Sequence, residues 1–182
     1  MSNKFGLFKF NQQFMHDYNE VNKKEEQNNE EVYDSTKDTQ KHIDKVAYYL
    51  NKIAEELIER GKNHDKSKLE EPEKSILDKY TPLLGTCEYN SDEYKKNSQE
   101  MKDLGFDKSH YSKNDHHLEQ YENGLNDIDL PLLCEIFSDY LASSQRTKDG
   151  DFVKSMDIVE KKYKFPIELK NIFLNTYKKL NK

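Results

Sequence analysis

The stretch RGKNHDKSKLEEPE, residues 60–73, places His64 beside Asp65 just after a glycine that marks the end of a predicted helix. Neutral imidazole and carboxylate groups are common ligands of Zn, Fe, Ni and Mn. A single His-Asp pair holds a metal ion only if further ligands converge on it. The same pair is also compatible with a simple helix cap, because Asp is a frequent N-cap residue.

Two further candidate ligands lie beside apolar stripes of predicted helices. His42 comes one turn before Val46, so its ring is expected along the edge of the face that packs inward. Asp139 lies between Ile136 and Tyr140, where burying an unpaired carboxylate would be costly. A metal ion or a basic partner would remove that cost. The alternatives are a hydrogen bond from His42 to a carbonyl and a salt bridge from Asp139 to a lysine.

Residues 105–128 contain three of the six histidines, His110, His116 and His117, together with an Asn-Gly turn signal. This composition predicts a loop with a short helical piece. Loops on a rigid scaffold often carry function. The sequence does not decide which of His116 and His117 points inward, and an ordinary surface loop remains an alternative for all three.

Helices are the elements predicted to position these residues. Apolar residues recur with the i, i+3, i+4, i+7 spacing of an amphipathic helix, and no segment alternates with period two for long enough to predict a strand. Gly61 and the pair Pro82 and Gly85 are expected to end the first two helices. The predicted fold is all-α, with helices at 35–61, 72–82, 92–104, 129–146, 152–159 and 166–180.

Length and composition predict one helical domain with an appendage. The 182 residues suffice for one core, and the low hydrophobic content of 34% with twelve Tyr predicts a small, tyrosine-lined one. Residues 1–34 combine a short amphipathic stretch with the polar run NKKEEQNNEE, so they are interpreted as an N-terminal appendage and linker. Residues 35–182 form the predicted domain.

Charge and cysteine content exclude several classes of partner. With a net charge of −6 and no separate basic block, an extended nucleic-acid footprint is not expected. No apolar run is long enough to span a bilayer, and the two cysteines lack C-x-x-C spacing. We expect a cytoplasmic protein with reduced thiols. Only two of the 29 basic residues are Arg, which is typical of AT-rich genes and indicates a low-GC bacterium or its phage.

The order of these residues resembles the HD-domain superfamily of metal-dependent phosphohydrolases: a helical His, a His-Asp pair, later histidines and an Asp on a late helix. The resemblance spans residues 39–146. Lys68 fits the His-Asp-x-x-Lys form of the motif, with Lys-Ser in place of the usual apolar-Gly pair. The segments HDKSK, NDHHLEQYENG and LCEIFSDYLASSQR are also similar to a family of small, uncharacterised phage and bacterial proteins, which often have Pro and Trp at the positions of Leu118 and Tyr140.

This resemblance implies an HD-like helical bundle with a metal site between its helices. It implies one or two divalent ions, of Mn, Fe, Ni, Co, Zn or Mg. The implied ligands of the first ion are His42, His64, Asp65 and Asp139, and those of the second are His110 with His116 or His117.

The implied reaction is hydrolysis of a small phosphorylated or nucleotide substrate. Asp65 and Lys68 would be catalytic, and Lys68 would also neutralise phosphoryl charge. Arg146 would clamp a phosphate with its planar fork of donors, or else be a cation that complements a helix C-terminus. Glu135 would orient a metal ligand by a hydrogen bond.

Two other functions fit the same residues. A di-iron centre on this scaffold would give an oxygenase, and a fold without turnover would give a module that binds a nucleotide or a protein.

Overall fold

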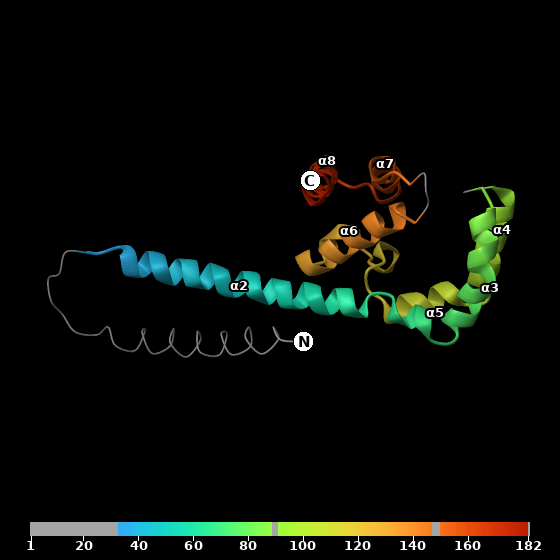
Figure 1. The fold of residues 1–182 in the computed structure, drawn as a ribbon, viewed down its shortest axis with the longest axis horizontal. Helices are drawn as coiled ribbons and strands as arrows, with labels where there is room; N and C mark the ends of the chain where they lie inside the picture. The colour runs from blue at the N-terminus through green and yellow to red at the C-terminus, as the bar shows by residue number, and fades with distance from the viewer. Residues whose placement is uncertain (1–32, 89–90, 147–149, 182) are drawn as a thin grey trace. The chain divides into compact units, whose positions relative to one another are not determined.

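The computed structural model describes residues 33–88, 91–146 and 150–181, which contain seven α-helices, three short 3-10 helices and no strand. This confirms the predicted all-α class (Figure 1). The elements are α2 (Thr36–Asn63), η1 (Lys66–Leu69), α3 (Glu73–Thr86), α4 (Asp92–Asp103), α5 (Phe106–Lys113), η2 (Leu118–Gln120), η3 (Gly124–Asp127), α6 (Leu130–Ser144), α7 (Phe152–Tyr163) and α8 (Ile167–Leu180).

The chain divides into two compact units, residues 1–55 and 56–182. The described part of the first unit consists of Tyr33 to Ser35 and the first turns of α2. The predicted N-terminal appendage and linker, residues 1–34, lies almost entirely outside the described residues. Everything that follows about the candidate site concerns the second unit.

Helix α2 forms where the apolar spacing predicted it and ends two residues beyond Gly61. Basic residues in its last turn, Arg60 and Lys62, complement the helix dipole. No described side chain of α2 is buried, and Ile43, Val46 and Leu50 are exposed. The periodicity indicates an amphipathic helix without specifying what covers its apolar face.

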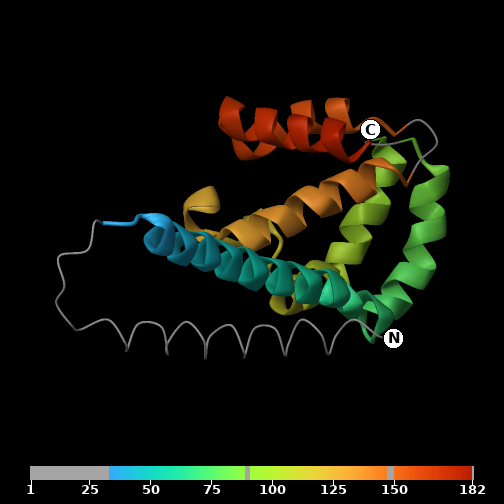
Figure 2. The same cartoon turned by 60° about the vertical axis from the view of Figure 1, so that its left-hand side comes forward.

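Helices α3, α4 and α5 form one packed group around a small core of Ile76, Tyr80 and Met101 (Figure 2). The Tyr80 hydroxyl donates a hydrogen bond to Glu100, so its polar end is satisfied. Helix α3 continues through Pro82 and Gly85 to Thr86. The helix therefore passes through Pro82, the first predicted breaker, and ends one residue beyond Gly85, the second.

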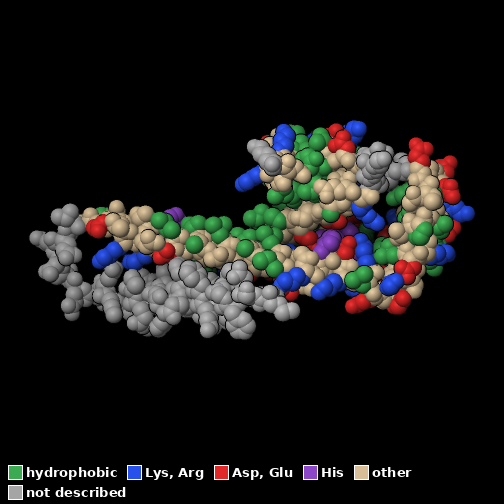
Figure 3. Space-filling model, viewed as in Figure 1, with side chains coloured by type: hydrophobic (Ala, Val, Ile, Leu, Met, Phe, Trp, Pro, Cys, Tyr) green, Lys and Arg blue, Asp and Glu red, His purple; other side chains and the backbone are tan. Residues whose placement is uncertain are grey.

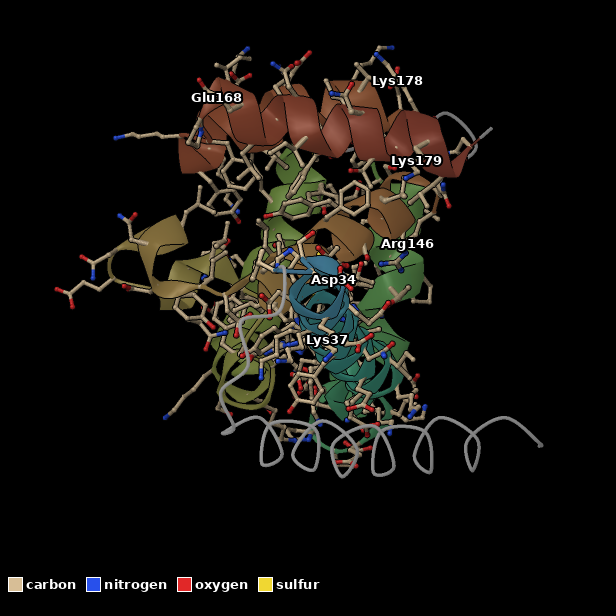
Figure 4. The ribbon with its side chains drawn as sticks, turned by 90° about the vertical axis from the view of Figure 1, so that its left-hand side faces the viewer. Asp34, Lys37, Arg146, Glu168, Lys178 and Lys179 are labelled. Atoms are coloured by element: carbon tan, nitrogen blue, oxygen red, sulfur yellow. The ribbon has the colours of Figure 1, made fainter. Side chains whose placement is uncertain are left out.

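Helices α6, α7 and α8 pack around the larger core, which is rich in phenylalanine (Figures 1 and 2). Asp129 caps α6, and its carboxylate accepts a hydrogen bond from the backbone N–H of Leu132 at 2.8 Å. Asp151 caps α7 in the same way. Helix α8 carries Glu168 in its first turn and two lysines in its last, as its dipole favours (Figure 4).

The histidine-bearing segment contains a loop and a short helix, as predicted. Helix α5 follows its N-cap Gly105, whose φ of 84° is readily adopted by glycine, and carries His110 on its last turn. An irregular stretch then carries His116 and His117 before η2. A short helix followed by a loop thus brings the three histidines together.

Among the helices of the described residues, none combines the length and apolar character of a bilayer-spanning segment. Both cysteines are free thiols.

Candidate metal centre

His64 and Asp65 lie in the turn between α2 and η1. The His64 N–H still donates to the carbonyl of Arg60, whereas Asp65 adopts a left-handed backbone with φ of 56° and ψ of 16°. This conformation is uncommon for residues other than Gly, and Asp is one of those that tolerate it. The reversal at Asp65 directs its carboxylate towards α5 and the following loop, where it meets the histidines.

Four buried atoms that could act as metal ligands lie close together, and none of them has a hydrogen-bond partner. They are Asp65 Oδ1, His110 Nε2, His116 Nε2 and His117 Nε2. The same four residues form a group whose ligand atoms all lie within 4.8 Å of one another. Buried polar atoms normally have a partner, and leaving one without is costly. Four of them facing one point constitute a group that could bind a metal ion.

The distances and ring contacts define this four-residue group. Asp65 Oδ1 lies 3.3 Å from His110 Nε2 and 3.4 Å from His116 Nε2. The His117 ring centroid lies 4.7 Å from that of His110 and 4.3 Å from that of His116. Three imidazoles with one carboxylate form a donor set that suits Zn, Fe, Mn, Co or Ni. The side chains present therefore fit a divalent transition-metal ion.

Burial and the neighbouring imidazoles His116 and His110 lower the pKa of His117 to about 4. His117 is therefore neutral near pH 7, which is the form that binds metals. Burial raises the pKa of Asp65, but the adjacent His110 imidazole and the ion pair with Lys68 outweigh it and lower the pKa overall. The carboxylate is accordingly ionised and able to act as a ligand.

A second cluster adjoins the first through His64. Glu135 Oε1 lies 2.8 Å from His64 Nδ1 and 3.3 Å from His116 Nδ1. His64 Nε2 lies 3.4 Å from Asp65 Oδ2 and 3.7 Å from Asp139 Oδ1. The nearby carboxylates of Asp139 and then Glu135 raise the pKa of His64 to about 10. His64 thus lies among three carboxylates.

Glu135 also holds Arg60, whose guanidinium reaches its Oε2 at 2.7 Å. The same guanidinium makes a two-pronged contact with Asp115, at 3.0 Å and 2.9 Å. Such planar pairing fixes geometry as well as charge. Arg60 thereby ties the end of α2 to α6 and to the loop that precedes His116.

A pocket of about 210 Å³ opens beside this second cluster. Figure 3 shows histidine and acidic side chains gathered in a recess of this unit. No apolar side chain lines the pocket, so it is suited to a small polar group. Its lining residues are Glu56, Glu59, Arg60, Asn63, His64, Lys113, Asn114, Asp115, His116 and Glu135.

The structure brings together all but two of the residues singled out from the sequence. His42 belongs to the first unit, where it is exposed on α2, and it is not a member of either group of candidate ligands. Arg146 is exposed just beyond the end of α6 (Figure 4). Lys68 does reach the site, where it pairs with Asp65 Oδ2. Both His116 and His117 belong to the four-residue group, so the choice between them is unnecessary.

Two residues at the site escaped the sequence analysis. Glu73 is completely buried and binds His110, and Arg60 binds Glu135. In the sequence, Glu73 is an ordinary acid after a proline, and Arg60 is an ordinary cation at a helix end. The scarcity of arginine, with only Arg60 and Arg146 in the chain, is the one signal that could have drawn attention to Arg60.

The comparisons with known proteins identify one family. A model of a family of unknown function, DUF5662, matches residues 31–179, which include every residue of the candidate metal centre. The chain belongs to the DUF5662 family. No curated protein and no solved structure gives a significant match. For this DUF5662 member, the chemistry of the site therefore has to be argued from its own side chains.

Proposed function

We propose that this DUF5662 protein is a divalent-metal-dependent phosphohydrolase acting on a small phosphorylated or nucleotide substrate. The observation that carries the proposal is the convergence of four buried, unpartnered donor atoms, Asp65 Oδ1 and the Nε2 atoms of three histidines. The resemblance of the His-Asp motif to HD-domain phosphohydrolases supports the choice of reaction.

Asp65, His110, His116 and His117 would hold the ion. A divalent ion bound there would supply a Lewis acid and a water molecule acidified towards neutral pH. The other oxygen of Asp65 is paired with Lys68, whose side chain is about one-third exposed. Lys68 can therefore reach a bound substrate while remaining beside the ligand, and it would neutralise negative charge on a phosphoryl group.

The second cluster would form the wall against which a substrate binds. His64 is held in place on both ring nitrogens by carboxylates, so its ring is fixed beside Asp65. The adjoining pocket is small and polar, which favours a phosphoryl or sugar group over an apolar one. Arg60, already paired with Glu135 and Asp115, would shape this wall, and Arg146 would have no part in it.

The first test is metal content after replacement of Asp65. We expect Asp65→Ala to lose most of the bound metal, because it removes the carboxylate of the group and leaves three imidazoles. His42→Ala is the matched control, since this histidine is exposed and lies outside the group. Elemental analysis of the purified full chain would measure both. Full metal occupancy in Asp65→Ala would show that the site is misassigned.

The second test is turnover. Purified protein loaded with Mn, Fe, Co, Ni or Zn should hydrolyse at least one member of a panel of phosphomonoesters, phosphodiesters and nucleotides, and Asp65→Ala should not. Redox-active iron without phosphoester hydrolysis would instead indicate an oxygen-activating centre. Tight nucleotide binding without turnover would indicate a binding module. Either result would contradict the proposed reaction.

A further inference from the structure

Glu73 is a buried carboxylate surrounded by hydrogen-bond donors. It lies in the first turn of α3, and its side chain has no exposed surface. Its Oε2 lies 2.7 Å from the Ser67 hydroxyl and 2.9 Å from His110 Nδ1, and its Oε1 accepts from the Ser109 hydroxyl at 3.0 Å. An acid in the first turn of a helix is usually solvated, so this degree of burial requires compensation.

The hydrogen-bonding capacity of Glu73 determines where the His110 proton lies. An ionised carboxylate only accepts hydrogen bonds, so His110 Nδ1 has to donate. The Asn114 amide also lies near Nδ1, but it donates to Ser67 Oγ at 2.7 Å and to the His110 carbonyl at 2.9 Å. A neutral imidazole with its proton on Nδ1 has its lone pair on Nε2. His110 Nε2 is one of the four converging unpartnered atoms.

A stacked contact further fixes the His110 ring. The Phe106 ring lies on it at 5.4 Å between centroids and an interplanar angle of 14°. With one face held by Phe106 and Nδ1 held by Glu73, the direction of the Nε2 lone pair is set before any ion binds. Carboxylate–histidine pairs of this kind orient ligands and raise their basicity.

We propose that Glu73 is a positioning residue of the metal centre, which holds His110 with its proton on Nδ1 so that Nε2 is directed at the ion. This inference rests on the proposed metal centre and does not depend on which reaction occurs there. The competing explanation is purely structural, because Ser67 and Ser109 also donate to Glu73 and tie η1 to α5. The two explanations predict different results for His110 itself.

The first measurement is the protonation of His110 in the metal-free wild-type protein. Long-range ¹H–¹⁵N NMR spectra at about pH 8.5, where an ordinary imidazole is neutral, distinguish the two ring nitrogens. We expect a protonated Nδ1. An unprotonated Nδ1 would overturn the proposal. This result needs no variant, so it holds even if substitutions at Glu73 impair folding.

The second measurement is metal affinity in Glu73→Gln, with Ser109→Ala as the matched control. The amide of Gln has nearly the same shape but can donate to Nδ1, so it no longer enforces the tautomer. Ser109→Ala removes one hydrogen bond of Glu73 and leaves the contact with His110 intact. We expect Co(II) affinity to fall about 10–100-fold in Glu73→Gln and much less in Ser109→Ala. A smaller loss, or one equalled by the control, would overturn the proposal.

Failure of this inference is distinguishable from failure of the proposed function. If the wild type and Glu73→Gln bind Co(II) equally, the positioning role is wrong while the metal centre stands. If the wild type binds metal and shows the expected His110 protonation but hydrolyses no substrate, the proposed reaction is wrong and the role of Glu73 stands. A wild type that binds no metal would overturn both.

Discussion

Individual residues at the centre show how charge is distributed over a small buried site. Glu135 Oε1 contacts ring nitrogens of His64 and His116, and Glu135 Oε2 accepts a hydrogen bond from Arg60. Burial raises the pKa of Glu135, but these partners outweigh it and lower the pKa. Removing one of these partners should destabilise the protein, because the carboxylate stays buried with less opposite charge around it.

Replacement of Arg60 should therefore destabilise the protein. We expect Arg60→Gln to lower the free energy of unfolding by about 2–4 kcal/mol, since it leaves Glu135 and Asp115 without their shared cation. Arg60→Lys should recover only part of the loss, because an ammonium cannot reproduce the planar two-pronged contact. Urea unfolding would measure the effect.

Lys74→Gln provides the comparison, because Lys74 forms an exposed pair with Asp78 that should be worth less than about 1 kcal/mol. Equal effects of the two Gln substitutions would mean that the buried network around Arg60 contributes little.

The ligand types were predictable from sequence, and their supporting residues were not. A His-Asp pair, a later group of histidines and an Asp beside buried positions already indicate a metal site, and the structure brings these residues together. Glu73 carries no such signal, since its role arises only when η1, α3 and α5 meet. His42 belongs to the first unit and is exposed there, because the spacing that places it beside an apolar stripe contains no information about what packs against that stripe.

Helix α6 contributes side chains both to the candidate metal centre and to the larger hydrophobic core. Glu135 and Asp139 face the site one turn apart, while Leu132, Ile136 and Phe137 are buried. The buried face of α6 thereby holds both carboxylates in register with His64. Loosening that face would shift these site residues as well as weaken the fold.

The core contribution of α6 can be measured at Ile136, which is 1% exposed. We expect Ile136→Ala to lower the free energy of unfolding by about 2–5 kcal/mol, because it removes buried methyl groups and leaves a cavity. Leu130→Ala in the same helix is the control, since Leu130 is exposed and should change stability by less than about 1 kcal/mol. A loss at Leu130 as large as that at Ile136 would contradict the observed packing of α6.

The elements were predicted to different extents for identifiable reasons. Amphipathic segments such as α6 and α7 formed as expected from their apolar periodicity, and each is capped by an Asp in the structure. Helix α3 passed through Pro82 and ended just after Gly85, although proline removes one helix hydrogen bond. Helix α5 was predicted only as a short helical piece without bounds, because its eight polar and aromatic residues lack an apolar stripe.

At the scale of the second unit, the candidate ligands come from segments far apart in the chain. Asp65 follows α2, His110 belongs to α5, and His116 and His117 lie in the loop before η2. The two hydrophobic cores are separate and small. An ion shared by these segments would therefore add a cross-link that neither core supplies.

Metal should consequently stabilise the whole unit. At a free metal concentration a hundredfold above the dissociation constant, we expect the free energy of unfolding to rise by about 2.7 kcal/mol, because the ion binds only the folded arrangement. Thermal unfolding with and without Co(II) would show it as a higher midpoint. Asp65→Ala should show no such increase, and an equal increase in this variant would mean that the ion binds elsewhere.

The left-handed backbone at Asp65 limits which residues can occupy that position. Glycine would satisfy the conformation but offers no carboxylate, whereas glutamate offers the charge on a side chain poorly suited to φ of 56°. Asparagine would fit the turn and lose the anion. Of these four residues, only aspartate meets both requirements. A substitution at position 65 is therefore expected to disturb the turn, the metal ligand or both.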